Sequence, residues 1–306
     1  MSRYYFSYNE YLKKTFSEKV YKIPLDIGFT CPNRDGNLGY GGCVYCENKS
    51  FSPNSHGPAR TVSEQIAEGI QIYKTRRKAQ KFIAYFQAYT NTYGEVEHLR
   101  NLYAEALSFP DVVGLSIGTR PDCVPEDVLN LLEEYHRRTH LWVEYGLETI
   151  HDGILDWMGR GHGFAQFQDA MIRTQRRNLR VCVHVILGFP GETHQMMMET
   201  AETLATTGIN ALKVHHLYIA KKTLLEKLYH EGRIPVMDLE TYIPLVCDFL
   251  ERIPEDVTIQ RVMGEIEGEY MVAPNWGFRK QDILKAIEAE FEKRGSRQGV
   301  RALQPG

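Results

Sequence analysis

The chain of 306 residues carries a formal net charge of −3, and 43% of its residues are hydrophobic. A charge so close to neutral argues against binding nucleic acid through bulk positive charge, although a local basic face stays open. The six cysteines are too few for a disulfide-stabilised scaffold, and no apolar run reaches the roughly 18 residues of a membrane span. The N-terminal residues contain no apolar signal segment, so we expect a cytoplasmic protein with no membrane partner.

Strand-like and helix-like segments alternate along most of the chain. Apolar, β-branched or aromatic runs predict strands at 23–29, 81–87, 112–119, 141–147, 181–189 and 211–218. Amphipathic stretches between them predict helices at 61–78, 95–107, 125–138, 164–177 and 193–206. Strands alternating with helices of this length are typical of parallel sheets with right-handed crossovers, which tend to curl. We therefore predict an α/β fold whose parallel sheet curls into a barrel or part of one.

Four segments are expected along the chain. An N-terminal lead-in (1–22), rich in aromatic residues, is expected to pack against the barrel core (23–220). A C-terminal α/β extension (221–294) is expected to pack on the barrel, with helices at 239–251 and 282–293 and a strand at 257–262. The tail (295–306) lacks periodicity and is predicted to be frayed and disordered.

Three of the cysteines stand in one glycine-rich loop after the first predicted strand. Cys31, Cys43 and Cys46 have the spacing C-x11-C-x2-C. Such a loop can fold tightly around a cluster and direct N–H groups at its sulfides. Structural zinc and electron-transfer clusters use four protein ligands, whereas three thiolates leave one iron open to bind a cofactor or substrate. A zinc site completed by His56 or a distant cysteine remains an alternative, as do three unligated thiols.

The other three cysteines stand in or beside apolar runs. Cys123, Cys182 and Cys247 are therefore predicted to be buried core thiols.

The cluster loop and five later segments resemble radical S-adenosylmethionine (SAM) enzymes, and specifically the YhcC/YtqA-like family. The loop reads GFTCPNRDG and GGCVYC, with the aromatic Tyr45 directly before its last cysteine. The resemblance continues through YFQAYTNTYG (85–94), TRPDCV (119–124), EYGLET (144–149), MGRGH (158–162) and ILGFPGET (186–193). TRPD and RGH are also shared, more distantly, with the elongator catalytic subunit and oxygen-independent coproporphyrinogen oxidase.

The resemblance implies a partial (β/α)6 TIM-like barrel with the cluster loop after its first strand, which agrees with the six predicted strands. It also implies two cofactors, a [4Fe–4S] cluster on Cys31, Cys43 and Cys46 and SAM. In such enzymes the open iron binds the amino and carboxylate groups of SAM. One electron, from a donor such as flavodoxin or ferredoxin, then splits SAM into methionine and a 5′-deoxyadenosyl radical, which abstracts hydrogen from a substrate. The cofactors carry the difficult chemistry, while the protein orients them and excludes water and oxygen.

The resemblance also assigns SAM contacts to individual residues. Tyr45 is expected against the adenine, and Arg160 is expected to bind the SAM carboxylate through its planar guanidinium. Glu148, where relatives often have Gln, matches a position that binds the ribose hydroxyls. His184 and Ile186 share one face of the fifth strand and match adenine contacts.

One segment departs from the pattern. Many radical SAM proteins end the second strand with Gly-Gly-Glu, which holds the SAM amine, and this chain has no such sequence there. Gln87 or Asn91 could supply the carbonyl acceptor instead, and the sequence does not choose between them.

Candidate substrate residues follow from position. Arg120 and Asp122 come after the third strand, at the barrel rim where catalytic groups gather. His215 and His216 are adjacent on the sixth strand, so one faces the lumen and is a substrate candidate. Trp276 is expected to stack on an extruded base.

The substrate hypothesis is a tRNA wobble uridine or a modification already carried there, suggested by the TRPD and RGH elements. A basic rim around the cluster loop would hold the RNA, formed by Lys13, Lys14, Lys19, Lys22, Arg34, Lys49 and Arg60. A small metabolite or a porphyrin-like molecule is the alternative substrate. The competing functions are a non-catalytic zinc or iron–sulfur protein that binds nucleic acid, and a βα-barrel hydrolase using Asp and His.

Overall fold

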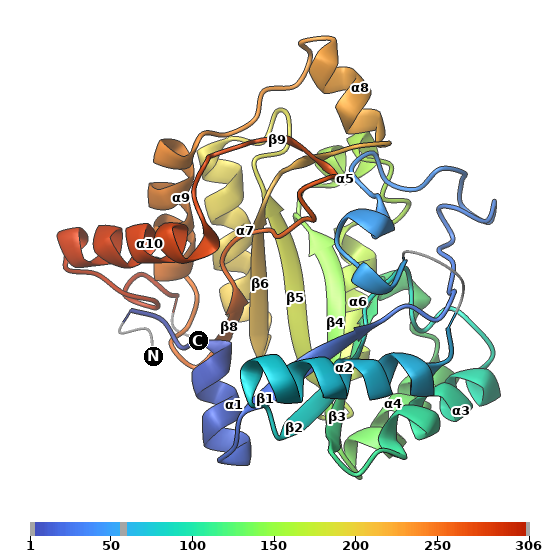
Figure 1. The fold of residues 1–306 in the computed structure, drawn as a ribbon. Coiled ribbons are helices and arrows are strands. Elements are labelled where there is room, and N and C mark those ends of the chain that lie inside the picture. Colours follow the sequence, from blue (N-terminus) through green and yellow to red (C-terminus); the bar gives the residue numbers. More distant parts are fainter. Residues whose placement is uncertain (1–3, 56–59, 304–306) are drawn as a thin grey trace.

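The computed structural model describes residues 4–55 and 60–303. Its main feature is a curled sheet of seven parallel strands, an open half-barrel (Figure 1). In spatial order the strands are β1 (Val20–Leu25), β2 (Lys81–Phe86), β3 (Val112–Thr119), β4 (His140–Glu148), β5 (Arg180–Leu187), β6 (Ala211–His216) and β8 (Thr258–Arg261). The predicted partial barrel is confirmed, with one more parallel strand than expected, because the strand of the C-terminal extension pairs with β6.

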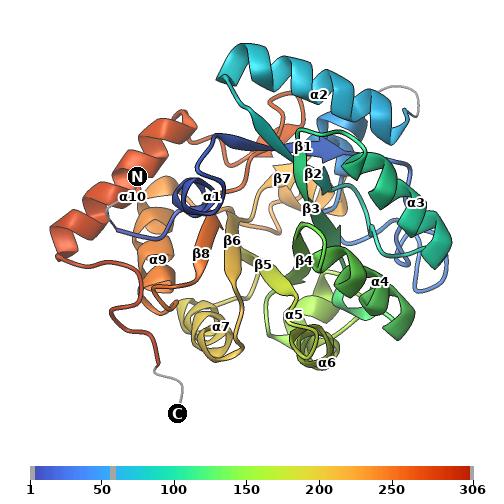
Figure 2. The ribbon, with the colours of Figure 1, turned by 90° about the horizontal axis from the view of Figure 1, so that it is seen from below.

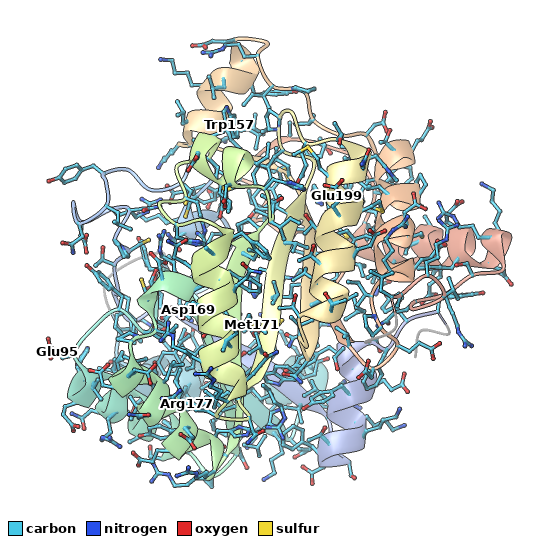
Figure 3. The ribbon with its side chains drawn as sticks, turned by 180° about the vertical axis from the view of Figure 1, so that it is seen from behind. Glu95, Trp157, Asp169, Met171, Arg177 and Glu199 are labelled. Atoms are coloured by element: carbon cyan, nitrogen blue, oxygen red, sulfur yellow. The ribbon has the colours of Figure 1, made fainter. Side chains whose placement is uncertain are left out.

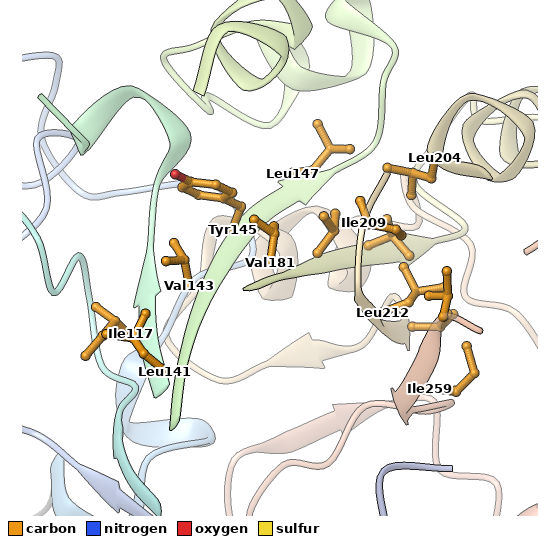
Figure 4. Close-up of a cluster of buried hydrophobic side chains, with 14 of the residues drawn as sticks. Ile117, Leu141, Val143, Tyr145, Leu147, Val181, Leu204, Ile209, Leu212 and Ile259 are labelled. Carbon is orange, nitrogen blue, oxygen red and sulfur yellow. The ribbon is translucent and has the colours of Figure 1, made fainter. Parts of the chain in front are cut away.

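Helices cover the outer face of this sheet (Figure 2). They are α2 (Val62–Arg77), α3 (Val96–Leu107), α4 (Glu126–His136), α6 (Phe164–Gln175), α7 (His194–Thr206) and α9 (Leu239–Glu251). The outward-facing strand residues form the core beneath them, and Figure 4 shows part of it, including Val143, Tyr145 and Val181. Alternate residues face the inside of the half-barrel, which leaves that face available for polar groups.

Polar side chains secure the exposed surface of the helical layer. Figure 3 shows Asp169 on α6 and Arg177 just after the C-terminal end of this helix, seen from behind. Arg173 donates to Asp169 at 2.7 Å, and Arg177 donates to Glu126 at the start of α4. The basic C-terminal end of α6 is therefore paired with acidic residues of neighbouring turns.

The aromatic lead-in forms a helix, α1 (Tyr8–Phe16), at the N-terminal ends of the strands. Seen from below, α1 stands between β1 and β8, where the arc of strands is open (Figure 2). Tyr8 and Tyr11 pack against Trp142 and Cys182 inside the half-barrel. This end of the lumen is thereby closed by aromatic side chains.

The remaining elements belong to connections and to the C-terminal part. They are the short helices α5 (Asp152–Trp157) and α8 (Leu224–His230), the antiparallel pair β7 (Ile219–Ala220) and β9 (Met271–Ala273), helix α10 (Lys280–Arg294), and three 3-10 turns, η1 (Asn48–Ser50), η2 (Pro53–Ser55) and η3 (Pro121–Cys123). Both α5 and α8 lie above the carboxyl ends of the strands (Figure 1).

The tail was expected to be frayed, and this is wrong for residues 295–303. The side chain of Gln298 is 2% exposed and donates to the carbonyls of Pro254 and Val257 at 2.6 and 2.8 Å. Its carbonyl oxygen accepts from the backbone N–H of Phe6 at 2.9 Å. The hydrogen bonds of the buried Gln298 amide hold this segment in place. Because the segment has no periodic apolar pattern, its order could not be predicted from the sequence.

Candidate active site

A cavity opens at the carboxyl ends of the strands, between the half-barrel and the loop after β1. It holds about 1120 Å³ of empty space, its open mouth included. Eleven of the residues predicted from sequence line it: Cys31, Cys43, Tyr45, Cys46, Gln87, Arg120, Glu148, Arg160, His184, Ile186 and His215. Residues from widely separated segments thus meet where parallel α/β folds place their active sites.

Each cysteine of the loop has an N–H donor beside its sulfur. Asn33 Nδ2 lies 3.4 Å and Arg160 Nη1 3.7 Å from Cys43 Sγ. Arg120 Nη1 lies 4.0 Å from Cys31 Sγ. For Cys46, the donor is the side-chain Nδ2 of Asn48, which lies 3.7 Å from Cys46 Sγ. Donors of this kind favour sulfur that carries negative charge, as thiolates on iron do.

The cluster loop is fastened to the segment that carries Arg160. Asn33 is buried and donates to the backbone carbonyls of Gly159 and Arg160 at 2.8 and 2.9 Å. Gly161 has a φ of +73°, and a Cβ there would stand 2.6 Å from the side-chain Oδ1 of Asn33. Glycine at 161 therefore allows the two loops to approach.

Burial dominates the ionisation of the thiol of Cys46. It raises the pKa of this thiol to about 11, against the opposing effect of the Arg34 guanidinium. A thiol with this pKa stays protonated at neutral pH unless a metal takes the place of the proton. The donor set fits a three-thiolate iron–sulfur cluster, because three sulfurs from one loop line one cavity and all have N–H groups beside them.

Arg160 and Glu148 form a buried ion pair in the cavity wall, beside Cys43. Arg160 Nη2 lies 3.4 Å from Glu148 Oε1 and donates to the carbonyl of Gly146. Arg160 Nε is buried and has no hydrogen-bond partner among the described residues, so it can still donate to a ligand. Burial raises the pKa of Glu148, which the charge of Arg160 opposes.

The other expected cofactor contacts lie around this pair. Tyr45 packs 6.0 Å from the ring of Phe189, measured between centroids. His184 and Ile186 face the lumen from β5, as their shared parity predicted. His184 Nε2 contacts Glu144 at 2.8 Å, and its ring stacks on His215.

The structure separates the two candidates for the SAM amine. Gln87 lines the cavity, and its amide nitrogen lies 3.4 Å from the carbonyl of Phe51. Asn91 is fully buried outside the cavity lining, where Nδ2 donates to the carbonyl of Gly118 at 2.9 Å. Asn91 therefore fixes the loop after β2 to β3.

Three tentative substrate residues do not lie on the cavity. Asp122 forms two hydrogen bonds of 2.9 Å with Arg120 and so holds that side chain in place. His216 points outward, 4.2 Å from the ring of Trp276, whose Nε1 donates to the carbonyl of Met237. Trp276 is packed in the C-terminal part of the chain, so the expected base-stacking role is wrong for this structure.

The expected basic rim is largely wrong as well. Lys13 and Lys14 belong to α1 and Lys19 precedes β1, at the end of the barrel opposite the mouth. Lys22 lies on β1 and pairs with Glu144 inside the barrel. Of the remaining members Arg34 lines the cavity, Arg60 pairs with Glu68 at 2.6 Å, and Lys49 lies on η1 beside the cluster loop. His56, the alternative zinc ligand, lies outside the described residues.

A buried charged cluster was missed by the sequence reasoning. Glu144 is fully buried inside the half-barrel and accepts hydrogen bonds from Lys22, Ser116, His184 and Lys213. The available signal was parity, because Glu144 stands four residues before Glu148 and Lys213 two residues before His215. The first strand is expected to begin at residue 23, which leaves Lys22 in the lead-in, whereas β1 begins at Val20 and includes Lys22.

Residues 29–204 match the Radical SAM superfamily, and residues 209–293 match the Radical_SAM C-terminal domain. The chain belongs to the radical SAM superfamily. The uncharacterised protein YtqA of Bacillus subtilis is 40% identical to this radical SAM chain over 295 residues, which are 96% of the chain and 92% of YtqA. A tRNA uridine(34) acetyltransferase of Dehalococcoides mccartyi is 24% identical over 185 residues, 59% of this chain and 39% of that protein.

The solved structure of Elp3 from the archaeon Methanocaldococcus infernus, lacking its N-terminal residues, resembles this radical SAM enzyme in fold. Its TM-score is 0.71 at 18% identity, over 92% of this chain and 64% of that one. Radical SAM enzymes use a [4Fe–4S] cluster and SAM, and they need a reductant, so these predictions are confirmed for the family. The predicted burial of Cys123, Cys182 and Cys247 is confirmed too. No helix of the described part of the chain is long and apolar enough to cross a membrane.

Proposed function

We propose that this radical SAM enzyme acts on a uridine at the wobble position of tRNA, or on a modification already carried there. The observation that carries the proposal is the similarity to the Dehalococcoides mccartyi protein, whose name states that it modifies uridine 34 of tRNA. The likeness to Elp3 supports the fold alone. We propose flavodoxin or ferredoxin as the electron donor.

We propose that Cys31, Cys43 and Cys46 hold the cluster and that its fourth iron is left for SAM. When bound, the cluster supplies the electron that splits SAM. The protein's part is to hold both cofactors in a fixed relation: Arg160 lies beside Cys43 and has a free Nε donor, which suits the SAM carboxylate. Glu148, 3.4 Å from Arg160, is placed for the ribose hydroxyls.

The remaining cofactor roles follow from position in the cavity. Gln87 is the better candidate for the SAM amine, because Asn91 does not reach the cavity. Tyr45 and Ile186 both line the cavity and offer apolar surface, which suits the faces of an adenine. The position of the cavity between the half-barrel and the cluster loop helps to exclude water from the radical.

The surface around the mouth supports RNA binding only through a few cations. Arg34 lines the cavity, and Lys221 and Lys222 are exposed in the turn before α8. That turn lies beside the cluster loop, because the N–H of Leu225 donates to the carbonyl of Val44 at 3.0 Å. Three cations can guide a tRNA loop to the mouth, with an affinity that falls as salt rises.

The direct test compares tRNA nucleosides from cells with the gene, without it, and complemented by either wild type or a Cys43→Ala variant. We expect deletion to change one wobble nucleoside, and only the wild-type gene to restore it. In vitro, the reconstituted, reduced enzyme should convert tRNA from the deletion strain while producing 5′-deoxyadenosine. If every wobble nucleoside is unchanged by deletion and tRNA fails to bind at low salt, the tRNA proposal is wrong.

A small metabolite is the second candidate substrate. The observation that favours it is the position of Lys13, Lys14, Lys19 and Lys22, none of which borders the mouth. A mouth with few cations suits a substrate smaller than a folded RNA. Metabolite profiles of the same deletion strain distinguish the two candidates.

A further inference from the structure

Behind the proposed cofactor pocket, a layer of polar side chains crosses the half-barrel. Six neighbouring strands each contribute one inward-facing residue: Lys22, Tyr85, Ser116, Glu144, His184 and Lys213. The next inward residues toward the N-terminal ends include Trp142 and Cys182, which α1 covers. The layer is therefore the floor of the cavity, which is lined by four of its members, Tyr85, Glu144, His184 and Lys213.

The floor contains two ammonium groups and one carboxylate. Lys22 and Lys213 both donate to Glu144, which has no other basic partner except His184 among the described residues. Burial alone would raise the pKa of Glu144, but the two lysines hold it well below the ordinary value. Burial lowers the pKa of His184 to about 4, so the imidazole is neutral at pH 7.

The other groups of the layer do not supply a second negative charge. Burial raises the pKa of Tyr85 well above its ordinary value and that of the Cys182 thiol to about 12. Burial also lowers the pKa of Lys213 to about 8, against the attraction of Glu144, which leaves the amine largely protonated at pH 7. The described residues of the floor thus carry one positive charge in excess.

A further cation stands next to Lys213. Arg261 of β8 is the Cα partner of Lys213 across the sheet and also lines the cavity. Its nearest carboxylate, Glu265, is 3.8 Å away and lies closer to Lys280, at 2.6 Å. Arg261 is therefore only partly neutralised.

Near Lys213 and Arg261, one more polar atom has no hydrogen-bond partner among the described residues. His215 lies two residues beyond Lys213 on the same inward face, and its Nε2 is buried with no partner among the described residues. Burial and the charge of Arg261 hold the pKa of His215 well below its ordinary value, so the ring is neutral and Nε2–H can donate.

The cations nearer the cluster are differently placed. Arg160 pairs with Glu148, and Arg120 pairs with Asp122, so these two arginines are balanced by carboxylates. A buried positive charge without a counterion is costly, and an anionic ligand would offset that cost.

We propose that the cavity floor binds a single negative charge on the substrate, as in a carboxylate group, through Lys213, Arg261 and His215. This inference rests on the cavity being the substrate site of a radical SAM enzyme, as proposed above, but not on the substrate being tRNA. A carboxylate is preferred to a phosphate because one negative charge matches the excess of one in the floor itself, while Glu265 partly neutralises Arg261.

The test uses the reconstituted enzyme loaded with SAM, so that the carboxylate subsite at Arg160 is filled. Sodium acetate or sodium phosphate replaces sodium chloride at constant ionic strength, and acetate affinity is obtained from the rise in unfolding midpoint. We expect Lys213→Met to weaken acetate binding about 10- to 100-fold, as for the loss of one charge-assisted hydrogen bond. The matched control is Lys81→Met, because Lys81 pairs with Asp111 at the opposite end of the barrel, 3.7 Å away.

Arg261→Gln provides a second variant that leaves every contact of Glu144 intact, in case Lys213→Met does not fold. It should weaken acetate binding in the same range. Equal acetate affinity in Lys213→Met or Arg261→Gln and in Lys81→Met would overturn the inference, as would a wild-type enzyme that responds to acetate no more than to chloride. A stronger response to phosphate than to acetate would overturn the single-charge assignment. Acetate binding together with unchanged tRNA nucleosides would keep this inference and remove the tRNA proposal.

Discussion

Arg160 and Glu148 lie 3.4 Å apart (Nη2 to Oε1) in the wall of the cavity, although they belong to a loop and to the end of β4 respectively. The same guanidinium lies 3.7 Å from Cys43 Sγ. One side chain therefore connects the proposed ribose-binding carboxylate to the cluster loop. A change at Arg160 should affect the binding of SAM more than the fold.

Replacing Arg160 by alanine should weaken SAM binding by roughly 10- to 100-fold, equivalent to about 1.5–3 kcal/mol, because a charge-assisted contact to the SAM carboxylate is lost. The iron content should stay that of the wild type, since the three thiolates remain. Equilibrium binding of SAM to the anaerobic protein measures the effect, with the exposed Arg176→Ala as control. An unchanged dissociation constant in a protein with an intact cluster would return Arg160 to a structural role.

Gly146 leaves the space through which Arg160 reaches its carbonyl. A Cβ at position 146 would stand 2.6 Å from Arg160 Nη2 and 2.7 Å from Glu148 Oε1. Because both atoms are ends of side chains, Gly146→Ala should fold but displace the pair and reduce SAM affinity. Gly153→Ala is the matched control, since nothing lies within 4 Å of a Cβ there. Equal SAM affinities of the two variants would show that the position of the pair is unimportant for binding.

The anaerobically reconstituted protein should bind about four irons and absorb broadly near 400 nm. Replacing Cys31, Cys43 or Cys46 by alanine should abolish both signals, because each supplies one of only three anchors. Replacing Cys123, Cys182 or Cys247 should preserve them in the folded fraction, as these thiols are buried in the core. A requirement for Cys247 with Cys31 dispensable would contradict the assignment.

His216 should make the stability of the protein depend on pH in mildly acidic solution. Burial lowers its pKa to about 4, from 6.5 in the unfolded chain, so the unfolded state binds more protons between these values. Stability is therefore lost as the pH falls from 6.5 toward 4, by at most about 3 kcal/mol for this group. His216→Phe keeps a ring beside Trp276 and should lose less stability than wild type over this range. Urea unfolding at pH 7, 5.5 and 4.5 measures the difference, and parallel curves would exclude His216 as a source.

The fold could be predicted because its strands carry strong local signals. The runs at 81–87, 112–119 and 211–218 became β2, β3 and β6, with ends shifted by at most two residues. The cluster cysteines could be predicted because their spacing is local too. β1 begins at Val20 rather than at the predicted residue 23, because Val20–Lys22 precede the most apolar part of the run. Lys22 belongs to the strand because it faces the buried carboxylate of Glu144 instead of water.

The residues that were wrongly placed depend on contacts between distant segments. Judged from the sequence alone, Trp276 could stack on a base, but in the structure it contacts Met237, His216 and Tyr242. Asn91 and Gln87 are equally good acceptors in sequence, and only the turn after β2 directs one inward. Glu144 and Lys213 appear as single charges in apolar runs, and their pairing requires the curvature of the whole sheet.

Gln298 joins the two ends of the described chain, since its backbone N–H donates to the carbonyl of Tyr4 and its side chain accepts from Phe6. The N–H of Ile259 likewise donates to the carbonyl of Phe6. During synthesis the N-terminal segment leaves the ribosome first, yet these partners follow more than 250 residues later. At the ribosomal rates of roughly 5–20 residues per second, Tyr4 and Phe6 wait more than about ten seconds for them. During that interval the N-terminal segment lacks these hydrogen-bond partners, so its backbone groups are available to chaperones.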